Sequence, residues 1–173
     1  MAFELRRTED TAIKIIEEHP DTYNAVRLMD ELSSDLEAIT GSSGRNSFSP
    51  DDVCVPRSVF AIAYDETGEA IGCGAFRPID GDAAEVKRMY ARTKAAGVGT
   101  EMLCYLETRA KQLGYSVLRL ETRLVNKRAV AFYEKRGYHR IPNYGKYAGR
   151  PEAVCFEKKI VQPKNRCFRG CVF

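Results

Sequence analysis

A glycine-bearing turn followed by an amphipathic helix constrains this chain more than any other stretch. The turn spans residues 94–100, with sequence KAAGVGT, and we expect the helix after it to reach Leu113 and end at Gly114. Apolar residues recur within it at spacings of three and four, which places them on one face packed on a core. That face consists of Val98, Met102, Leu103, Leu106, Ala110 and Leu113.

The turn itself has the composition of an anion-binding loop. Four of its residues are small, so a ligand can approach the backbone closely. They are Ala95, Ala96, Gly97 and Gly99. The first N–H groups of a helix have no intrahelical acceptor and carry partial positive charge, which favours a phosphate or pyrophosphate. An ordinary tight turn explains the same residues, so the ligand interpretation depends on the rest of the chain.

The predicted helix connects two predicted strands. Residues 84–91 precede the turn, with Val86, Arg88 and Tyr90 alternating with the residues between them, and residues 115–121 follow the helix. A strand, a helix and a strand in this order predict a right-handed crossover with the two strands parallel. Ligands of such units bind beyond the carboxyl ends of the strands, which places residues 91–99 and 122–126 on one rim.

Further elements extend this unit to an α/β fold. We expect a strand at 12–16, a helix from Pro20 to Gly41, an antiparallel hairpin of 58–64 with 70–77, and a final hairpin of 138–141 with 154–160. The polar loop at 41–47 is of a kind that often borders a binding cleft, although a solvated connector explains it equally.

A second informative stretch, NKRAVAFYEKRGY, covers residues 126–138. Asn126 has the side chain of a helix cap, and Gly137 stands where the helix must end. The apolar residues between them recur at helical spacing and predict a buried face. That face consists of Ala129, Val130, Phe132 and Tyr133.

Composition narrows the class of protein. The 173 residues suit one domain, at 12–161, with an arm at 1–11 and a tail at 162–173. A net charge of +3 is too small to argue for a nucleic-acid partner, and we expect none. The chain has neither an apolar run long enough to span a membrane nor a secretory leader, so we expect no membrane partner and a cytoplasmic location. Six scattered cysteines and two histidines predict buried free thiols and no metal site.

With both stretches, the chain resembles the GNAT superfamily, the Gcn5-related N-acetyltransferases, over residues 12–161. The family's second motif, Asn-x-x-Ala-x-x-φ-Tyr-x-x-x-Gly-Phe/Tyr, is matched at every defined position. Its residues here are Asn126, Ala129, Phe132, Tyr133, Gly137 and Tyr138. In the first motif, Arg/Gln-x-x-Gly-x-Gly/Ala, Gly97 and Gly99 match the glycines and Lys94 replaces the Arg or Gln, while the turn before them is short.

The resemblance implies a mixed central sheet with a β-α-β-α core and transfer of an acetyl group from acetyl-CoA, as co-substrate, to an amine. It implies a pyrophosphate cradle of backbone N–H groups, pairing of the preceding strand with the pantetheine arm, and splaying of the two parallel strands around the thioester. Asn126 would hydrogen-bond the arm, which is compatible with helix capping through a different atom. The cofactor-binding residues so expected are Met89, Ala91, Lys94, Ala95, Ala96, Gly97, Val98, Gly99, Thr100, Asn126 and Tyr133.

The resemblance also implies the catalytic residues. Tyr133 matches the tyrosine that protonates the departing CoA sulfur, and a core aromatic with a locally satisfied hydroxyl is the alternative. Two carboxylates compete as the base. Glu121 lies twelve residues before Tyr133, as in ribosomal-protein alanine N-acetyltransferases, and Glu85 begins the preceding strand, where histone-type members keep their base. Glu121 is favoured, and a carboxylate paired with Arg or Lys is the structural alternative for either.

The acceptor is the least determined feature. The segments expected to select it, residues 41–49 and 143–151, are short enough to close over a compact pocket, so a small-molecule amine or amino acid is preferred. A peptide or ribosomal-protein N-terminus is second, because residues 120–138 resemble those of such enzymes. A non-catalytic acyl-CoA-binding module is third, and a homodimer is left open. Aromatic residues expected to line the acceptor pocket are Phe76, Tyr144 and Tyr147.

Overall fold

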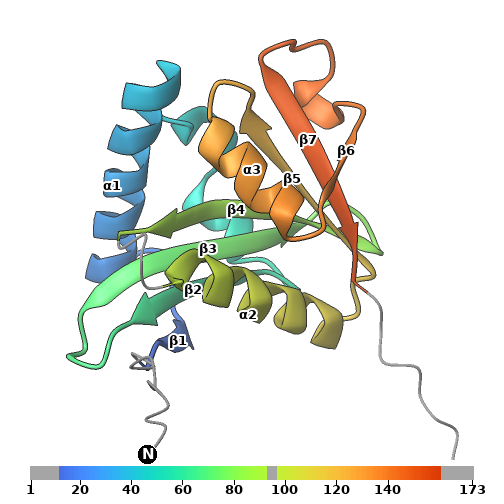
Figure 1. The fold of residues 1–173 in the computed structure, drawn as a ribbon. Coiled ribbons are helices and arrows are strands. Elements are labelled where there is room, and N and C mark those ends of the chain that lie inside the picture. Colours follow the sequence, from blue (N-terminus) through green and yellow to red (C-terminus); the bar gives the residue numbers. More distant parts are fainter. Residues whose placement is uncertain (1–11, 93–96, 161–173) are drawn as a thin grey trace, which may run out of the picture.

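The computed structural model describes residues 12–92 and 97–160, and Figure 1 shows how their elements are arranged. Seven strands and three α-helices lie within these residues, with short 3-10 turns between some of them. The elements are β1 (Lys14–Glu17), α1 (Tyr23–Thr40), η1 (Arg45–Ser47), η2 (Pro50–Val53), β2 (Val59–Tyr64), β3 (Ala70–Pro78), β4 (Ala83–Ala91), α2 (Val98–Gln112), β5 (Val117–Arg123), α3 (Lys127–Lys135), β6 (His139–Ile141), η4 (Gly145–Tyr147) and β7 (Ala153–Lys159).

The strands form one mixed sheet in the order β1-β2-β3-β4-β5-β7-β6. Neighbouring strands are antiparallel, except that β4 and β5 are parallel and are connected through α2. The two predicted hairpins and the predicted crossover are therefore confirmed. The sequence pattern did not predict that β7 lies between β5 and β6.

Helices cover both faces of the sheet. α1 lies on one face, and α2 and α3 lie on the other (Figure 1). The apolar face predicted for α2 is buried in the larger core, together with Tyr133 of α3 and Phe156 of β7. On the opposite face, α1 buries Ala25 and Leu28 against Phe60 of β2. A ligand can therefore pass from one layer to the other only where neighbouring strands separate.

β4 and β5 separate in this way toward their carboxyl ends. They pair only between Ala83 and Glu85 on β4 and between Val117 and Arg119 on β5. Beyond that point β4 continues to Ala91 without β5, while β5 stays paired with β7 on its other side. Backbone N–H and C=O groups need hydrogen-bond partners when water is excluded. The splayed edges are thus suited to an extended ligand that carries amide groups.

A β-bulge interrupts β4 at the start of this gap. Cys73 of β3 pairs with Tyr90, but Ala75 pairs with Lys87, so the bulge places one extra residue on β4. Arg88 takes a left-handed conformation within it, with φ of 54°. A bulge bends its strand and re-aims side chains. The strict alternation expected along this strand is therefore wrong beyond Lys87.

Gly72 of β3 allows α2 to begin close to the sheet. A Cβ atom built on it would lie 2.7 Å from the backbone oxygen of Tyr90 and 2.7 Å from Cγ1 of Val98. Because backbone cannot move aside as a flexible side chain can, we predict that Gly72→Ala lowers the free energy of unfolding by about 1–3 kcal/mol. Urea unfolding measures this change. Gly81→Ala is the control, since nothing lies within 4 Å of its built Cβ, and equal losses in both variants would contradict the packing argument.

Some predictions for single residues were wrong. β5 begins at Val117 rather than at 115, because Tyr115 is packed in the core with its hydroxyl donating to the backbone oxygen of Arg57 at 2.9 Å. Among the described cysteines, the predicted burial is confirmed for Cys73 and Cys155. It is wrong for Cys54 and Cys104, which are exposed free thiols. The predicted arm and tail lie outside the described residues.

Candidate active site

A cavity of about 330 Å³ opens where β4 and β5 separate. Its wall includes Leu32 and Leu36 from α1 and also Asn126 and Tyr133 from the α3 segment. Because α1 and α3 lie on opposite faces of the sheet, the cavity crosses the sheet. A donor on the α3 side and an acceptor on the α1 side can therefore meet within it.

Two loops complete the wall on the α1 side. The loop after α1 contributes Ser42, Gly44, Asn46, Ser47 and Phe48, and the segment before β7 contributes Lys146, Tyr147 and Arg150. Both segments expected to select the acceptor thus border the cavity, and the loop after α1 is more than a solvated connector. Tyr147 lines the cavity as predicted, whereas Tyr144 does not line it and packs edge-on against the Tyr147 ring. The prediction for Phe76 is wrong, since it is fully buried in the core against Tyr115.

Tyr133 lines the cavity with 8% of its surface exposed. Its ring packs edge-on against Phe132 and Tyr138, which fixes its orientation. Its hydroxyl has no hydrogen-bond partner among residues 12–92 and 97–160, so the locally satisfied hydroxyl considered above is not observed. Burial raises the pKa of Tyr133 above its ordinary value, which keeps the hydroxyl protonated at neutral pH. At neutral pH the cavity is therefore lined by a protonated tyrosine hydroxyl.

Asn126 caps α3 and also lines the cavity. Its Oδ1 accepts a hydrogen bond from the backbone N–H of Ala129 at 3.2 Å. Its Nδ2 has no partner in the described part of the chain. Capping uses the oxygen of the amide and leaves the nitrogen available to a ligand. Both predicted roles are thus compatible in one side chain.

The start of α2 has the properties of an anion site. Gly97 precedes the helix with φ of 70°, a conformation that favours glycine. The first intrahelical bond runs from the N–H of Glu101 to the oxygen of Gly97 at 3.0 Å. The N–H groups before it have no acceptor within the helix. These belong to Val98, Gly99 and Thr100.

A cation adds to this positive end. Arg136, which ends α3, hydrogen-bonds the hydroxyl of Thr100. Met89 lines the cavity, and Ala91 ends β4 opposite Gly72 on the edge that β5 has left. The other predicted members of the cradle lie outside the described residues. They are Lys94, Ala95 and Ala96.

Glu85 belongs to a network of buried charges. The Tyr147 hydroxyl donates to its Oε1 at 2.8 Å, and the Lys87 ammonium lies 3.0 Å from the same oxygen. Arg77 lies 3.4 Å from its Oε2. Burial by itself would raise the pKa of Glu85, but Lys87 and Arg77 outweigh this effect and lower it. Glu85 is therefore an ion-paired carboxylate with little tendency to accept a proton.

Glu121 has a different environment. It lines the cavity with 12% of its side chain exposed, and the Nε of Arg123 lies 3.8 Å from its Oε1. Burial raises the pKa of Glu121, and the charges of Lys87 and Arg123 offset this only in part. Such a carboxylate accepts protons more readily than an ordinary Glu. The cavity therefore brings Glu121 together with Tyr133, whereas Glu85 is not a lining residue.

Sequence reasoning missed the cations that line the cavity. They are Lys87, Arg88, Arg123, Lys146 and Arg150. They come from β4, the end of β5 and the segment before β7, and no motif or spacing connects these segments. Only the register of the sheet and the closure of the loops bring their side chains together.

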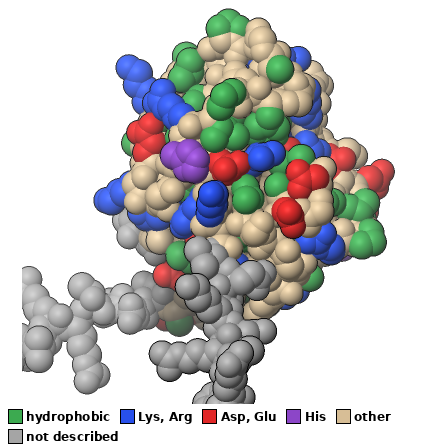
Figure 2. All heavy atoms as spheres, turned by 90° about the vertical axis from the view of Figure 1, so that its right-hand side faces the viewer, with side chains coloured by type: hydrophobic (Ala, Val, Ile, Leu, Met, Phe, Trp, Pro, Cys, Tyr) green, Lys and Arg blue, Asp and Glu red, His purple; other side chains and the backbone are tan. Residues whose placement is uncertain are grey.

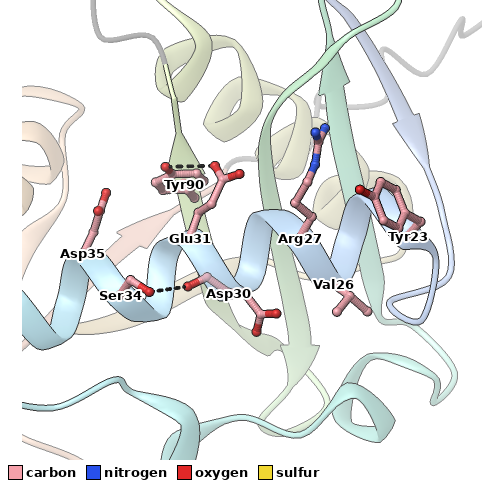
Figure 3. A pocket seen from close by; sticks show the side chains of 8 residues that line it. All are labelled: Tyr23, Val26, Arg27, Asp30, Glu31, Ser34, Asp35 and Tyr90. Carbon is pink, nitrogen blue, oxygen red and sulfur yellow. Dashed lines mark hydrogen bonds between the residues drawn. The ribbon is translucent and has the colours of Figure 1, made fainter.

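A second, more open hollow of about 540 Å³ lies along the outward face of α1, and Figure 3 shows its lining. Two of its three acidic residues are paired: Glu31 pairs with Arg92 and accepts from the Tyr90 hydroxyl at 3.2 Å, and Asp30 pairs with Arg45 at 2.9 Å. No predicted site residue lines this hollow. Its contacts fasten the end of β4 to α1, which is a structural role.

The described residues meet neither the requirements of a metal site nor those of a membrane-spanning helix. Among the described residues, no three His, Cys, Asp or Glu side chains are grouped so that they could hold a metal ion. No helix in this part of the chain combines the length and apolar character needed to cross a membrane. Acidic and basic side chains are interspersed on the face beside β6 and β7 (Figure 2).

Comparisons with known proteins agree with this geometry. The family model described as "Acetyltransferase (GNAT) family" matches residues 19–138. An IAA acetyltransferase from Azospirillum brasilense is 28% identical over 151 residues, which cover 86% of this chain and 98% of that protein. The crystal structure of a candidate acyl-CoA N-acyltransferase from Klebsiella pneumoniae is similar with a TM-score of 0.73 and 25% identity, and the match covers 86% of this chain and 98% of that one.

A third similarity concerns a ligand-bound structure. A GNAT family acetyltransferase from Elizabethkingia anophelis with acetyl-CoA bound has a TM-score of 0.62 and 19% identity, over 85% of this chain and 97% of that one. At this identity the similarity shows the fold alone. The family model, in contrast, covers well over half of the sequence, including the turn before α2 and the whole α3 motif. This chain belongs to the GNAT acetyltransferase family.

Proposed function

We propose that this protein transfers the acetyl group of acetyl-CoA to the primary amine of a small molecule or amino acid by direct attack of that amine. The observation that carries this proposal is the cavity through the sheet, which joins Tyr133 and Asn126 on the α3 side to Glu121. Leu118 and Leu120 point into the core on the α2 side, so Glu121 points to the α1 side by strand alternation. Acid and base thus flank the gap between the strands.

The chain offers groups that suit each part of acetyl-CoA. The first turn of α2, with Arg136 beside it, suits the pyrophosphate. The free Nδ2 of Asn126 and the edge of β4 at Met89 and Ala91 suit the amides of the pantetheine arm. The expected cradle residues Lys94–Ala96 would extend the first of these sites. When bound, acetyl-CoA supplies an activated acetyl thioester.

Each catalytic role follows from the surroundings of its residue. Glu121 takes the proton that the attacking amine loses as the C–N bond forms, directly or through water. The backbone N–H of Met89, which stands in the β4 bulge without a register partner, is the candidate donor to the developing oxyanion. Tyr133 gives its proton to the sulfur as the C–S bond breaks, so CoA leaves as a neutral thiol.

The test is incubation with acetyl-CoA and a pooled panel of amino acids, polyamines, aminoglycosides and short peptides, read by mass spectrometry. Mass spectrometry is preferred to a thiol dye, because the exposed Cys54 and Cys104 would react with the dye. We expect an acetylated product that depends on both protein and acetyl-CoA. Binding of acetyl-CoA in calorimetry without any product would instead favour a non-catalytic acyl-CoA-binding module.

A second candidate function is acetylation of a peptide or ribosomal-protein N-terminus. The spacing of twelve residues between Glu121 and Tyr133 favours it. The compact cavity of about 330 Å³, bordered by loops on the α1 side, favours the small acceptor. Faster acetylation of the short peptides than of any amino acid in the panel would establish the peptide function.

A further inference from the structure

The cavity through the sheet is strongly basic. Its charged lining residues are one anion, Glu121, and five cations, which are Lys87, Arg88, Arg123, Lys146 and Arg150. Charges of one sign in a cleft with low-dielectric walls concentrate the field inside it. An acceptor in this cleft therefore meets a positive potential, and this potential is strongest where cations lack acidic partners.

Three of the five cations have no carboxylate partner among the described residues. Lys87 lies 3.0 Å from Glu85, and Arg123 lies 3.0 Å from Glu152, so these two are paired. The unpaired cations are Arg88, Lys146 and Arg150. Arg88 is half-buried in the wall of the cavity, and Lys146 and Arg150 are exposed at its edge. An anion in the cavity would be a counterpart for all three charges.

Arg88 is held in place without being neutralised. Its Nη2 donates to the backbone oxygen of Gly44 at 3.2 Å, and its Nη1 lies 3.5 Å from Oγ of Ser33. The guanidinium also packs on the ring of Phe48. Its Nε is shielded from solvent and has no hydrogen-bond partner in the described part of the chain. A buried N–H without an acceptor is costly. The guanidinium as a whole pairs with no carboxylate of the described residues, although a carboxylate is the acceptor that an Arg binds best.

The backbone at Arg88 has an unusual conformation within the bulge of β4. With φ of 54°, Arg88 has a left-handed conformation that residues other than glycine rarely adopt. Such strain persists where the surroundings fix it, and it is concentrated at ligand sites. The bulge directs Arg88 to the loop after α1, which lies on the face to which Glu121 also points.

We propose that Arg88, assisted by Lys146 and Arg150, binds a carboxylate of the acceptor, and that the acceptor is an amino acid whose amine is directed to Glu121. This inference rests on the proposed function and specifies its substrate class. The same field disfavours polycationic acceptors such as polyamines and aminoglycosides, because their additional ammonium groups would be repelled by the lining cations.

Equilibrium binding tests this proposal without requiring turnover. N-acetyl derivatives of the standard amino acids and of the matching amino acid amides are titrated into the protein with CoA present, using calorimetry. The two series differ only in the carboxylate. We expect the best carboxylates to bind at least about 10-fold more tightly than their amides, as one charged hydrogen bond predicts. Equal affinities, or no measurable binding of either series, would overturn the proposal.

The variant Arg88→Gln should no longer bind the N-acetyl amino acids more tightly than their amides. We expect its affinity for carboxylates to fall about 10- to 100-fold, with amide affinity within about threefold of the parent, and Arg88→Lys to restore part of the loss. Arg119→Gln is the matched control, since Arg119 pairs with Glu157 and does not line the cavity. Thermal unfolding shows whether each variant is folded. If Arg88→Gln does not fold, Lys146→Gln provides the same comparison.

The turnover assay separates failure of this inference from failure of the proposed function. If amino acid amides or polyamines are acetylated as fast as amino acids, the inference that the acceptor carries a carboxylate is wrong. The proposed function, acetyl transfer to an amine, would still stand. Preferential binding of N-acetyl amino acids without any acetyl transfer would support the carboxylate site and overturn the enzymatic function alone.

Discussion

Replacing Tyr133 by Phe is expected to lower kcat by about 100-fold or more, because the variant has no proton to give to the departing sulfur. The ring contacts with Phe132 and Tyr138 are retained in the variant. Among the described residues, no group is hydrogen-bonded to the Tyr133 hydroxyl. Removing this hydroxyl therefore leaves no described donor or acceptor without its partner. The affinity for acetyl-CoA should stay within about threefold of the parent. Steady-state kinetics and calorimetry measure the two quantities.

Tyr138→Phe is the matched control for this variant. Tyr138 is also buried, but its hydroxyl donates to Glu107 at 3.2 Å and does not line the cavity. Its loss should reduce stability by about 1 kcal/mol and leave kcat nearly unchanged. A Tyr133→Phe enzyme as fast as the parent would remove Tyr133 as the acid. Since burial raises the pKa of Tyr133, deprotonation of this group should not limit the parent rate below its ordinary pKa of 10.0.

Replacing Glu121 by Gln is expected to lower kcat/KM by about 100-fold, because Gln has the same shape and cannot accept a proton. In the parent, the rate should rise with pH as Glu121 ionises, with a midpoint above its ordinary pKa of 4.5. This rise should be absent in the variant. A pH–rate profile of kcat/KM, measured at constant ionic strength, provides the test.

Glu85→Gln separates the two candidate bases. Glu85 is ion-paired and its pKa is lowered, so its loss should change the pH–rate profile little. Its main effect should be on stability, because Lys87 would keep a buried charge without its carboxylate partner, a loss of about 3 kcal/mol. Arg77 would keep its pair with Asp52. Unchanged profiles in both Gln variants would remove both residues as bases, and a large effect of Glu85→Gln alone would reverse the assignment.

The two carboxylates should also have opposite effects on stability. For Glu121 the pKa is raised in the folded state, so its contribution to stability is present below its unfolded pKa and is lost as pH rises through the folded pKa. Glu121→Gln should therefore be more stable than the parent at neutral pH. For Glu85 the pKa is lowered, so its contribution is present at neutral pH and is lost as pH falls through the folded pKa. Urea unfolding at neutral and acidic pH measures both trends.

The sequence determined what depends on neighbours along the chain. The three- and four-residue spacing from Val98 to Leu113 predicted the buried face of α2, and Asn126 with Gly137 predicted both ends of α3. The crossover between β4 and β5 followed from the order of the elements, and the family resemblance implied the gap between these strands. These features follow from helical periodicity, capping and chain handedness, which are local or topological. The family resemblance rests on the same residues.

The tertiary structure decided what depends on residues far apart in the sequence. From the sequence both Glu85 and Glu121 were candidates for the base, with Glu121 favoured by family resemblance alone. In the structure Tyr147 and Lys87 bind Glu85, while Glu121 faces the cavity with a raised pKa. The bulge that turns Arg88 toward the loop after α1 likewise follows from pairing with β3. Burial and charge act through space, so a pKa or a cavity is a property of the assembled sheet and loops. A local pattern fixes which residues share a helix face, and only packing fixes which charges meet.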